Sequence, residues 1–341
     1  MPWANPMADR PQPPAAPSLQ SRGGRNHPRA THAAARLLGA ALLLTILTEA
    51  GLRFILGLGN PILIQSDAAC SYILKPDQEV KRFFVRTRTN HYGMRSDEPS
   101  TARQAGSLRL MFVGDSIPYG GTRVDQQQIF TERLHRDLQA QLHRPVEVLN
   151  ASAGAWAPDN ELSYLRSRGI FQSDIVLLVL NDGDLSQPRS TLADVGEDLP
   201  QQRPLTAIGE LFTRYLRPIV LHFVQKTDAG DQLAANADAQ TRANLADLDS
   251  IDALVTAQGA RLVLIYIPFR RDIPQPANSQ FAILKSWTDA RHVALLDLTS
   301  AEAPYSAAQI TIDNGIHLNA NGHRVIAEAI ESAWPRLAGD R

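Results

Sequence analysis

Five short apolar runs, separated by stretches with helical periodicity, dominate the hydrophobic pattern from residue 108 onward. Two of them, 175–180 and 262–267, are continuously apolar, as central parallel strands covered on both faces usually are. The predicted strands are 109–113, 145–150, 174–180, 261–267 and 293–297. The predicted helices are 126–142, 159–168, 207–225, 239–258, 279–290 and 321–334. The alternation predicts an α/β fold: a three-layer α/β/α sandwich around a flavodoxin-like, parallel five-stranded sheet.

The N-terminal region has a different pattern. Residues 1–32 are rich in Pro, Ala, Arg and Gly, which predicts a disordered basic N-terminus. Residues 33–58 are mostly apolar, without interruption from Leu37 to Thr48, and predict a transmembrane signal anchor. A cleaved signal peptide and a buried helix of a soluble protein are the alternatives. An Ala-x-Ala cleavage site is not evident where a signal peptide would need one.

The charges around this segment predict its orientation. Arginines precede it, so the positive-inside rule leaves the N-terminus in the cytoplasm and residues 60–341 on the far side. Glu49 and Arg53 are four residues apart, a spacing that lets them pair on one helix face near the outer interface.

Two further regions connect the predicted elements. Residues 59–107 predict a β-rich spacer, in which 79–90 alternates like an exposed strand or hairpin and 90–95 reads as a turn. The favoured interpretation is a spacer without chemistry of its own. The alternative is that its arginines face anionic lipid or polysaccharide. Residues 183–206 are polar, contain proline and follow the third strand, which predicts a lid or a substrate-facing insertion over a domain that spans 108–341.

Composition narrows the possible functions. The formal net charge is -1 and no basic stripe alternates with aromatics, so a nucleic-acid partner is not expected. The chain has one cysteine, Cys70, which excludes an intrachain disulfide and is interpreted as a structural thiol. Zinc-type Cys/His spacing and a Walker-type phosphate loop are both missing from the sequence, so neither a metal nor a cofactor is expected.

Two short motifs, about two hundred residues apart, carry the candidate chemistry. The segment 112–116 places Ser116 just after an apolar strand, and the segment 313–319 places His317 just before the last helix. A serine hydroxyl is a weak nucleophile until a base takes its proton, so a Ser–His pair is the minimum machinery for acyl transfer. Each motif alone is weak, because Ser116 also fits a helix N-cap and His317 a polar residue near one. Their position at the carboxyl ends of predicted strands favours an active site.

Together these motifs resemble those of the SGNH (GDSL-type) hydrolase superfamily, over roughly residues 108–338. Gly114-Asp115-Ser116 is similar to its serine block, and the last block resembles its Asp-x-x-His motif. The anchor, the spacer and the Tyr-Gly-Met-Arg turn are similar, more loosely, to membrane-anchored bacterial members. The resemblance implies the α/β/α sandwich, with Ser116 as nucleophile, His317 as base, and the backbone N–H groups of Ser116 and Gly154 as oxyanion donors. An ordinary loop glycine is the alternative for Gly154.

The chain departs from the family pattern at two places. In an alignment without gaps, the asparagine that donates to the oxyanion in the family falls on Gly183, and Asn181 lies two residues earlier. Either Asn181 still serves as the third donor or that donor is missing. Asn314 stands three residues before His317, where the family has Asp, and Asp313 is adjacent. Asp313 is the preferred partner of His317, and a Ser–His dyad oriented by Asn314 is the alternative. His323 is interpreted as a helix-face residue.

The resulting hypothesis is a serine esterase or deacylase, anchored by a single pass in the bacterial inner membrane, with its catalytic domain periplasmic or extracytoplasmic. Its partners would be an ester-bearing small molecule, glycan or lipid of the cell envelope, and the membrane itself. An O-acyltransferase acting on a glycan, and a catalytically inactive fold that binds an envelope glycan, are the alternatives.

Overall fold

The computed structural model describes residues 28–100, 103–196, 199–217, 237–270, 279–313 and 315–338. The predicted disordered segment therefore lies mostly outside the described residues. The chain divides into two compact units, 1–47 and 48–341. The predicted boundary at residue 108 is not a boundary between compact units, because residues 59–107 belong to the same unit as the sheet.

The N-terminal helix, α1 (Pro28–Phe54), confirms the predicted helix but starts earlier and ends sooner than 33–58. Residues 32–54 are long and apolar enough to cross a membrane, with a mean hydropathy of 1.6 over their most apolar window. The chain turns sharply after α1, with Gly57 at φ +73°. A Cβ there would lie 2.1 Å from the carbonyl oxygen of Lys81, so only glycine permits this close approach of the two segments.

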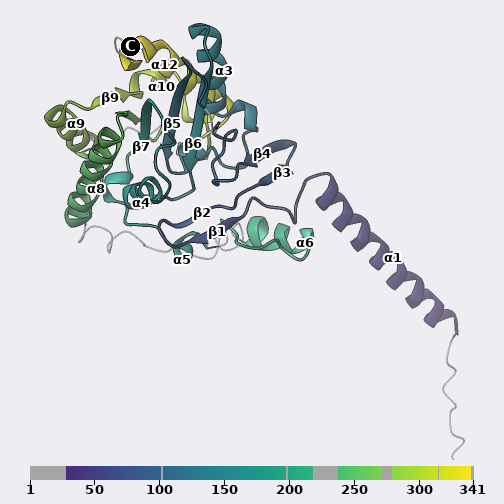
Figure 1. Cartoon of the computed structure of the whole chain (residues 1–341). Helices are drawn as coiled ribbons and strands as arrows, with labels where there is room; N and C mark the ends of the chain where they lie inside the picture. The colour runs from purple at the N-terminus through teal and green to yellow at the C-terminus, as the bar shows by residue number, and fades with distance from the viewer. Residues whose placement is uncertain are drawn as a thin grey trace, which may run out of the picture. The chain divides into compact units, whose positions relative to one another are not determined.

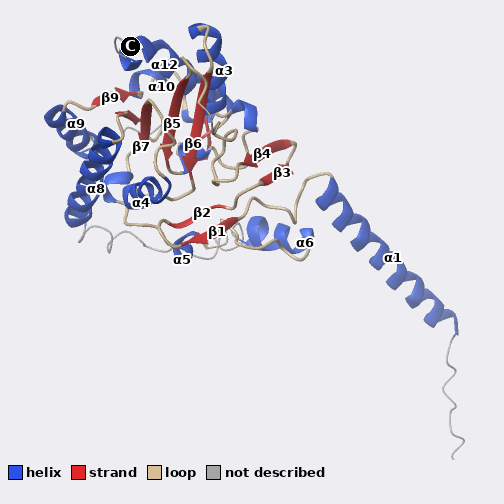
Figure 2. Cartoon of the chain, viewed as in Figure 1, coloured by secondary structure: helices blue, strands red, loops and turns tan. Residues whose placement is uncertain are grey.

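A parallel five-stranded sheet forms the centre of the second unit (Figures 1 and 2). Its spatial order is β6-β5-β7-β8-β9, which is the flavodoxin-like order 2-1-3-4-5, so this prediction is confirmed. The strands are β5 (Leu108–Gly114), β6 (Val146–Ser152), β7 (Ile175–Leu180), β8 (Arg261–Tyr266) and β9 (Ala294–Asp297). Every residue of β5 and β7 is buried; β7 is continuously apolar, and the one charged residue of β5, Arg109, pairs with Glu147 on the neighbouring strand.

Helices cover both faces of the sheet and give the predicted three layers (Figure 2). In β5, Phe112 packs with α3 and α12, whereas its neighbour Met111 packs with α4, α8 and α9. This alternation follows from the two-residue period of a strand. The long helices are α3 (Phe130–Leu142), α4 (Pro158–Arg168), α8 (Ala237–Ala257), α9 (Ser279–Arg291) and α12 (Ala320–Ala338).

Shorter helices occupy the connections. A predicted helix over 207–225 is α6 (Ala207–Glu210) followed by a π-helix, η3 (Leu211–Leu216), and its remainder from 218 lies outside the described residues. The region 183–206 contains η2 (Asp184–Ser186) and α5 (Leu192–Val195). The others are α2 (Ser116–Tyr119), η1 (Gln126–Gln128), α10 (Thr299–Glu302) and α11 (Ala307–Ile310).

Three antiparallel pairs complete the described elements. The predicted hairpin at 79–90 is β3 (Gln78–Arg82) with β4 (Val85–Thr89), and β1 (Ile64–Asp67) pairs with β2 (Ser71–Leu74). Side chains of β1 and β2 join the core on the α4 face of the sheet. Near the C-terminus, β10 (Thr311–Asp313) pairs with β11 (His317–Leu318).

Candidate active site

The structure brings Ser116 and His317 together from opposite ends of the domain. The strand β5 ends at Gly114, and Asp115 caps α2 by accepting the N–H of Ile117 at 2.8 Å. Ser116 is the first residue of that short helix, and His317 begins β11. The Nε2 atom of His317 lies 3.2 Å from the Oγ atom of Ser116, within hydrogen-bond reach of a nucleophile and its base.

The residues proposed to support His317 are only partly described. In the β10–β11 pair, the backbone of Asp313 lies opposite that of His317. The side chain of Asp313 and all of Asn314 lie outside the described residues. The choice between the two therefore stays a prediction.

Gly154 lines the cavity that Ser116 also lines, and its role as an oxyanion donor stays a prediction. Gly154 follows β6 and is buried. A Cβ at this position would lie 3.1 Å from Leu199 across that cavity. The next residue, Ala155, has φ +62°, a left-handed conformation that a non-glycine residue adopts rarely. The loop is thus bent sharply where Gly154 would present its N–H group.

Asn181 is held between two carboxyl groups. Its Nδ2 atom donates to Asp115 at 3.0 Å and to Asp184 at 3.1 Å, which uses both amide hydrogens. Its Oδ1 atom accepts the N–H of Gly183 at 2.7 Å. Asn181 lines the cavity and fixes Asp115, the residue next to Ser116. The prediction that it is an oxyanion donor requires it to release one of these carboxyl oxygens.

Sequence reasoning missed this group of buried carboxyls. Burial raises the pKa of Asp115, and it raises the pKa of Asp184 and of Glu161 well above their usual range. The charges of Asp115 and Glu161 raise the pKa of Asp184 further. The one available signal was the pair of acidic residues in the segment 181–184, which follows the third strand.

A second group that sequence reasoning missed comes from the predicted spacer. Arg95 is 0% exposed and donates to the carbonyl oxygens of Tyr119 at 2.6 Å and Val124 at 2.7 Å, and also to that of Gly121. Burial lowers the pKa of Arg95 to about 10, which leaves it charged at neutral pH. Arg95 therefore fixes the loop that follows Ser116. The Tyr-Gly-Met-Arg turn was the signal in the sequence.

Two hollows meet at the Ser116–His317 pair. The larger, about 560 Å³, is lined partly by polar groups such as Asn181 and Gln187; its apolar wall consists of Tyr119, Val195, Leu199, Phe269 and Ile316. The smaller, about 190 Å³, includes Thr122 and Arg123. Ser116 and His317 line both, so Ser116 is open to a molecule that extends in two directions.

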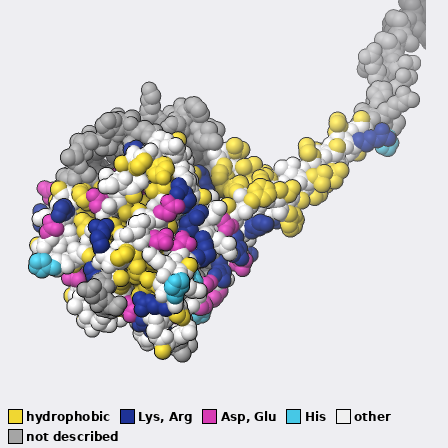
Figure 3. All heavy atoms as spheres, turned by 90° about the horizontal axis from the view of Figure 1, so that it is seen from above, with side chains coloured by type: hydrophobic (Ala, Val, Ile, Leu, Met, Phe, Trp, Pro, Cys, Tyr) yellow, Lys and Arg dark blue, Asp and Glu magenta, His cyan; other side chains and the backbone are white. Residues whose placement is uncertain are grey.

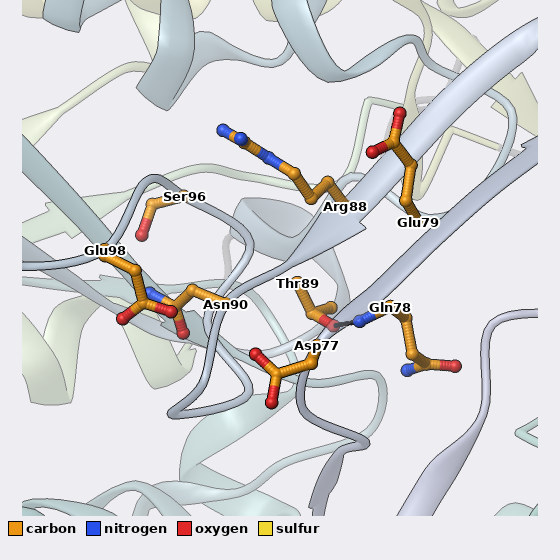
Figure 4. Close-up of a pocket in the computed structure, with 8 residues that line it drawn as sticks. All are labelled: Asp77, Gln78, Glu79, Arg88, Thr89, Asn90, Ser96 and Glu98. Atoms are coloured by element: carbon orange, nitrogen blue, oxygen red, sulfur yellow. Dashed lines mark hydrogen bonds between the residues drawn. The ribbon is translucent and has the colours of Figure 1, made fainter.

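Another hollow, of about 270 Å³, lies on the β3–β4 hairpin (Figure 4). Its polar groups have partners within the chain: Gln78 N–H donates to the Thr89 hydroxyl at 3.1 Å, and Arg88 pairs with Asp97, which lies outside the hollow. We interpret it as a solvated surface of the hairpin. Among the described residues, a group of three or more His, Cys, Asp or Glu side chains that could hold a metal ion is not found.

His323 and Cys70 lie in the interior. Nδ1 of His323 accepts the N–H of Phe130 at 3.2 Å, and its ring stacks on that phenylalanine. Burial lowers the pKa of His323 to about 3, so the ring stays neutral at physiological pH. Cys70 is 0% exposed, and burial with the neighbouring Asp67 raises its pKa to about 12, which agrees with an unreactive structural thiol.

Comparison with known proteins gives matches only among solved structures; family models and curated proteins give none. LAE5, an alpha/beta hydrolase enzyme from the metagenome of Lake Arreo, Spain, is 17% identical, with 68% of this chain and 96% of that chain covered and a TM-score of 0.44. A mutant of Axe2, an acetyl-xylooligosaccharide esterase from Geobacillus, is 14% identical (67% and 95% covered, TM-score 0.43). The psychrotrophic esterase EstA from Pseudoalteromonas is 12% identical (67% and 98% covered, TM-score 0.40). With TM-scores below 0.5, the case for a function rests on the residues of this chain.

Proposed function

We propose that this protein is a serine esterase or deacylase that hydrolyses an O-acyl ester on a cell-envelope glycan or lipid. The observation that carries the proposal is the 3.2 Å approach of His317 Nε2 to Ser116 Oγ, with Gly154 lining the same cavity. A capping serine or a surface histidine needs no such partner. The position of both residues at the carboxyl edge of a parallel sheet also favours catalysis.

In the proposed reaction, Ser116 Oγ attacks the ester carbonyl as His317 takes its proton. The backbone N–H groups of Ser116 and Gly154 stabilise the oxyanion, a contribution worth about 3 kcal/mol per donor in other acyl-transfer enzymes. His317 then protonates the leaving alcohol, and an acyl–Ser116 ester remains. Water, deprotonated by His317, attacks this ester, releases the acid and returns the serine.

The two hollows suit the two sides of an ester. The apolar wall of the larger hollow would hold the acyl group, and the smaller one, with Thr122 and Arg123, would hold the alcohol. If a sugar hydroxyl occupied the smaller hollow in place of water, the same residues would catalyse O-acyl transfer. An inactive glycan-binding fold is the other alternative, supported by the departures at Gly183 and Asn314.

The proposed location is the bacterial inner membrane, with α1 as a single pass and residues from 60 onward in the periplasm. The support is the length and hydropathy of residues 32–54 together with the arginines that precede them. A C-terminal alkaline-phosphatase fusion of the full chain should be active and should fractionate with membranes. An inactive fusion, or a chain in the soluble cytosol, contradicts the anchor and the envelope substrate together.

A fluorophosphonate probe tests the chemistry, because only an activated serine reacts with it. The full-length protein should be labelled, and Ser116→Ala should not. Absence of labelling in the folded wild type would leave the binding fold as the explanation. Comparing acetate release with acetyl transfer to a glycan then separates hydrolysis from transfer.

A further inference from the structure

Exposed large hydrophobic side chains beyond Leu47 gather on three short segments of the second unit. Among the described residues, seven of the eight belong to segments 48–58, 81–86 and 203–217, and the eighth is Ile283. We call the seven the apolar patch: Phe54, Ile55, Phe83, Phe84, Leu205, Phe212 and Leu216. Leu205 is 97% exposed and Phe84 is 70% exposed, so these are not the edges of a packed core.

Contacts between the three segments hold them together. Glu49 accepts the N–H groups of Ala207 at 2.8 Å and Ile208 at 3.0 Å, and so caps α6 from the last turns of α1. Arg53 pairs with Glu49 at 2.8 Å, as its spacing predicts, and also donates to the Leu205 carbonyl. These bonds fix the end of α1 against segment 203–217.

The hairpin segment is fixed to the same place. Phe83 N–H donates to the Leu56 carbonyl at 2.9 Å, and the Phe83 ring meets that of Tyr215 edge-on at 5.9 Å. Arg82 and Glu210 form a buried ion pair at 2.6 Å beneath these rings. A buried pair of this kind holds its two segments in one register, because loss of either partner leaves an uncompensated charge.

The charges on these segments are mostly positive. Their acidic residues are Glu49 and Glu210, and both are bound within the chain. Their cationic residues are Arg53, Lys81, Arg82, Arg86, Arg203, Arg214 and Arg217. Arg82 is buried, and Arg53 and Arg214 pair with these same acidic residues. Figure 3 shows hydrophobic side chains gathered next to the base of α1, with Lys and Arg among the side chains around them. Aromatic and aliphatic side chains bordered by cations suit the interface of an anionic bilayer.

We infer that the apolar patch is a membrane-binding surface, which seats the catalytic body on the lipid leaflet that α1 leaves. The occupant is the headgroup and upper acyl region of a bilayer with anionic lipids. The argument is continuity: the patch begins at the end of the one described helix that is apolar enough to span a membrane, and that helix end is bonded to it. The inference rests on the proposed anchor and not on the proposed chemistry.

Site-directed fluorescence tests the inference on the full chain. Leu205→Cys and Phe212→Cys each place a thiol on the patch, and Ile283→Cys is the matched control, an exposed hydrophobic position outside it. The native Cys70 is 0% exposed, which allows selective labelling of the new thiols with bimane. Each labelled protein is reconstituted in vesicles of phosphatidylethanolamine and phosphatidylglycerol that contain nitroxide-labelled lipid near the headgroup. Circular dichroism checks the fold of each variant.

Emission at positions 205 and 212 should be quenched strongly by the nitroxide lipid, whereas emission at position 283 should not change. Quenching should fall when phosphatidylcholine replaces phosphatidylglycerol. Equal quenching at all three positions would overturn the inference. It would also be overturned if the patch labels were shielded from a soluble quencher but not quenched by the nitroxide lipid, because that result would indicate a protein partner.

A label at Leu44→Cys, near the middle of α1, is read with lipid that carries the nitroxide deep in its acyl chain, and it separates failure of the patch from failure of the anchor. Quenching at 44 without quenching at 205 and 212 keeps the anchor and rejects the patch. Quenching at 205 and 212 alone rejects the span and, with it, the inference as stated, because the patch would then bind lipid without an anchor. Quenching at none of the three rejects both. None of these readouts depends on ester hydrolysis, so an inactive protein gives the same answer.

Discussion

The phenol of Tyr72 donates a 2.7 Å hydrogen bond to the carbonyl oxygen of Gly154. Tyr72 lies in the region predicted as a spacer, and Gly154 is the proposed oxyanion donor. Burial raises the pKa of Tyr72, so the phenol keeps its proton and remains a donor well into the alkaline range. The predicted spacer therefore has a direct contact with the oxyanion loop.

Tyr72→Phe should lower kcat for a short p-nitrophenyl ester about tenfold, with little change in KM. Without the hydroxyl the Gly154 carbonyl loses a buried partner, and the loop that presents the Gly154 N–H relaxes; a tenfold change corresponds to about 1.4 kcal/mol. Steady-state kinetics are the measurement. Tyr164→Phe is the matched control, since it removes a buried hydroxyl that donates to the Tyr92 carbonyl. Equal losses of kcat in both variants would mean that the Tyr72 hydroxyl contributes only to the stability of the fold.

Ser116→Ala should abolish ester hydrolysis and leave the fold intact. In other Ser–His–Asp enzymes, loss of the nucleophile costs about a millionfold in kcat. Ser163→Ala, on α4, is a matched control, because its hydroxyl contacts Asp159 rather than His317. Activity and circular dichroism of both variants are the readouts. Undiminished turnover in a folded Ser116→Ala protein would exclude the serine mechanism.

The partner of His317 can be assigned by two substitutions. If Asp313 orients the imidazole and stabilises its charged form, Asp313→Asn should reduce kcat about 10⁴-fold, as in other triads, while Asn314→Ala should stay within a few-fold of wild type. The backbone pairing of Asp313 with His317 motivates this order. A larger loss in Asn314→Ala would reverse the assignment and favour a Ser–His dyad.

Glu302 should make the protein less stable as the pH rises. Both of its carboxyl oxygens are buried without a hydrogen-bond partner, and burial raises its pKa to about 8. Between the unfolded pKa, near 4.5, and about 8, the folded state binds the extra proton, so stability falls by up to about 1.4 kcal/mol per pH unit. Glu302→Gln removes this loss.

Urea unfolding at pH 5 and pH 7.5 measures the effect. The stability advantage of Glu302→Gln over wild type should be larger at pH 7.5 than at pH 5. The exposed Glu328→Gln, on α12, is the control and should show no such growth. An advantage that is equal at the two pH values would mean that Glu302 does not titrate in this range.

The sheet could be predicted from the sequence because each strand has a hydrophobic pattern that is visible within a few residues. Leu110 and Leu177 lie in apolar runs that are typical of strands covered on both faces. The Gly-Asp-Ser turn directly follows the run that contains Leu110. The partners of the turn could not be predicted in the same way. The bond from Tyr72 to Gly154 joins residues 82 apart, and Asn181 reaches Asp115 across 66. Such contacts depend on how the loops fold over the sheet edge, which hydrophobic periodicity does not encode.

The buried guanidinium of Arg95 has a consequence for how this protein can be divided. It supplies the donors for three carbonyl oxygens of the loop after Ser116, and the buried carbonyls of Tyr119 and Val124 would lose this donor without it. A chain cut to begin at the first strand of the sheet would keep every proposed catalytic residue and lose that brace. The α/β/α sandwich from residue 108 onward therefore cannot be transferred alone with this loop intact. The smallest piece that gene fusion or recombination could transplant with this brace intact begins upstream of Arg95, within the region predicted as a spacer.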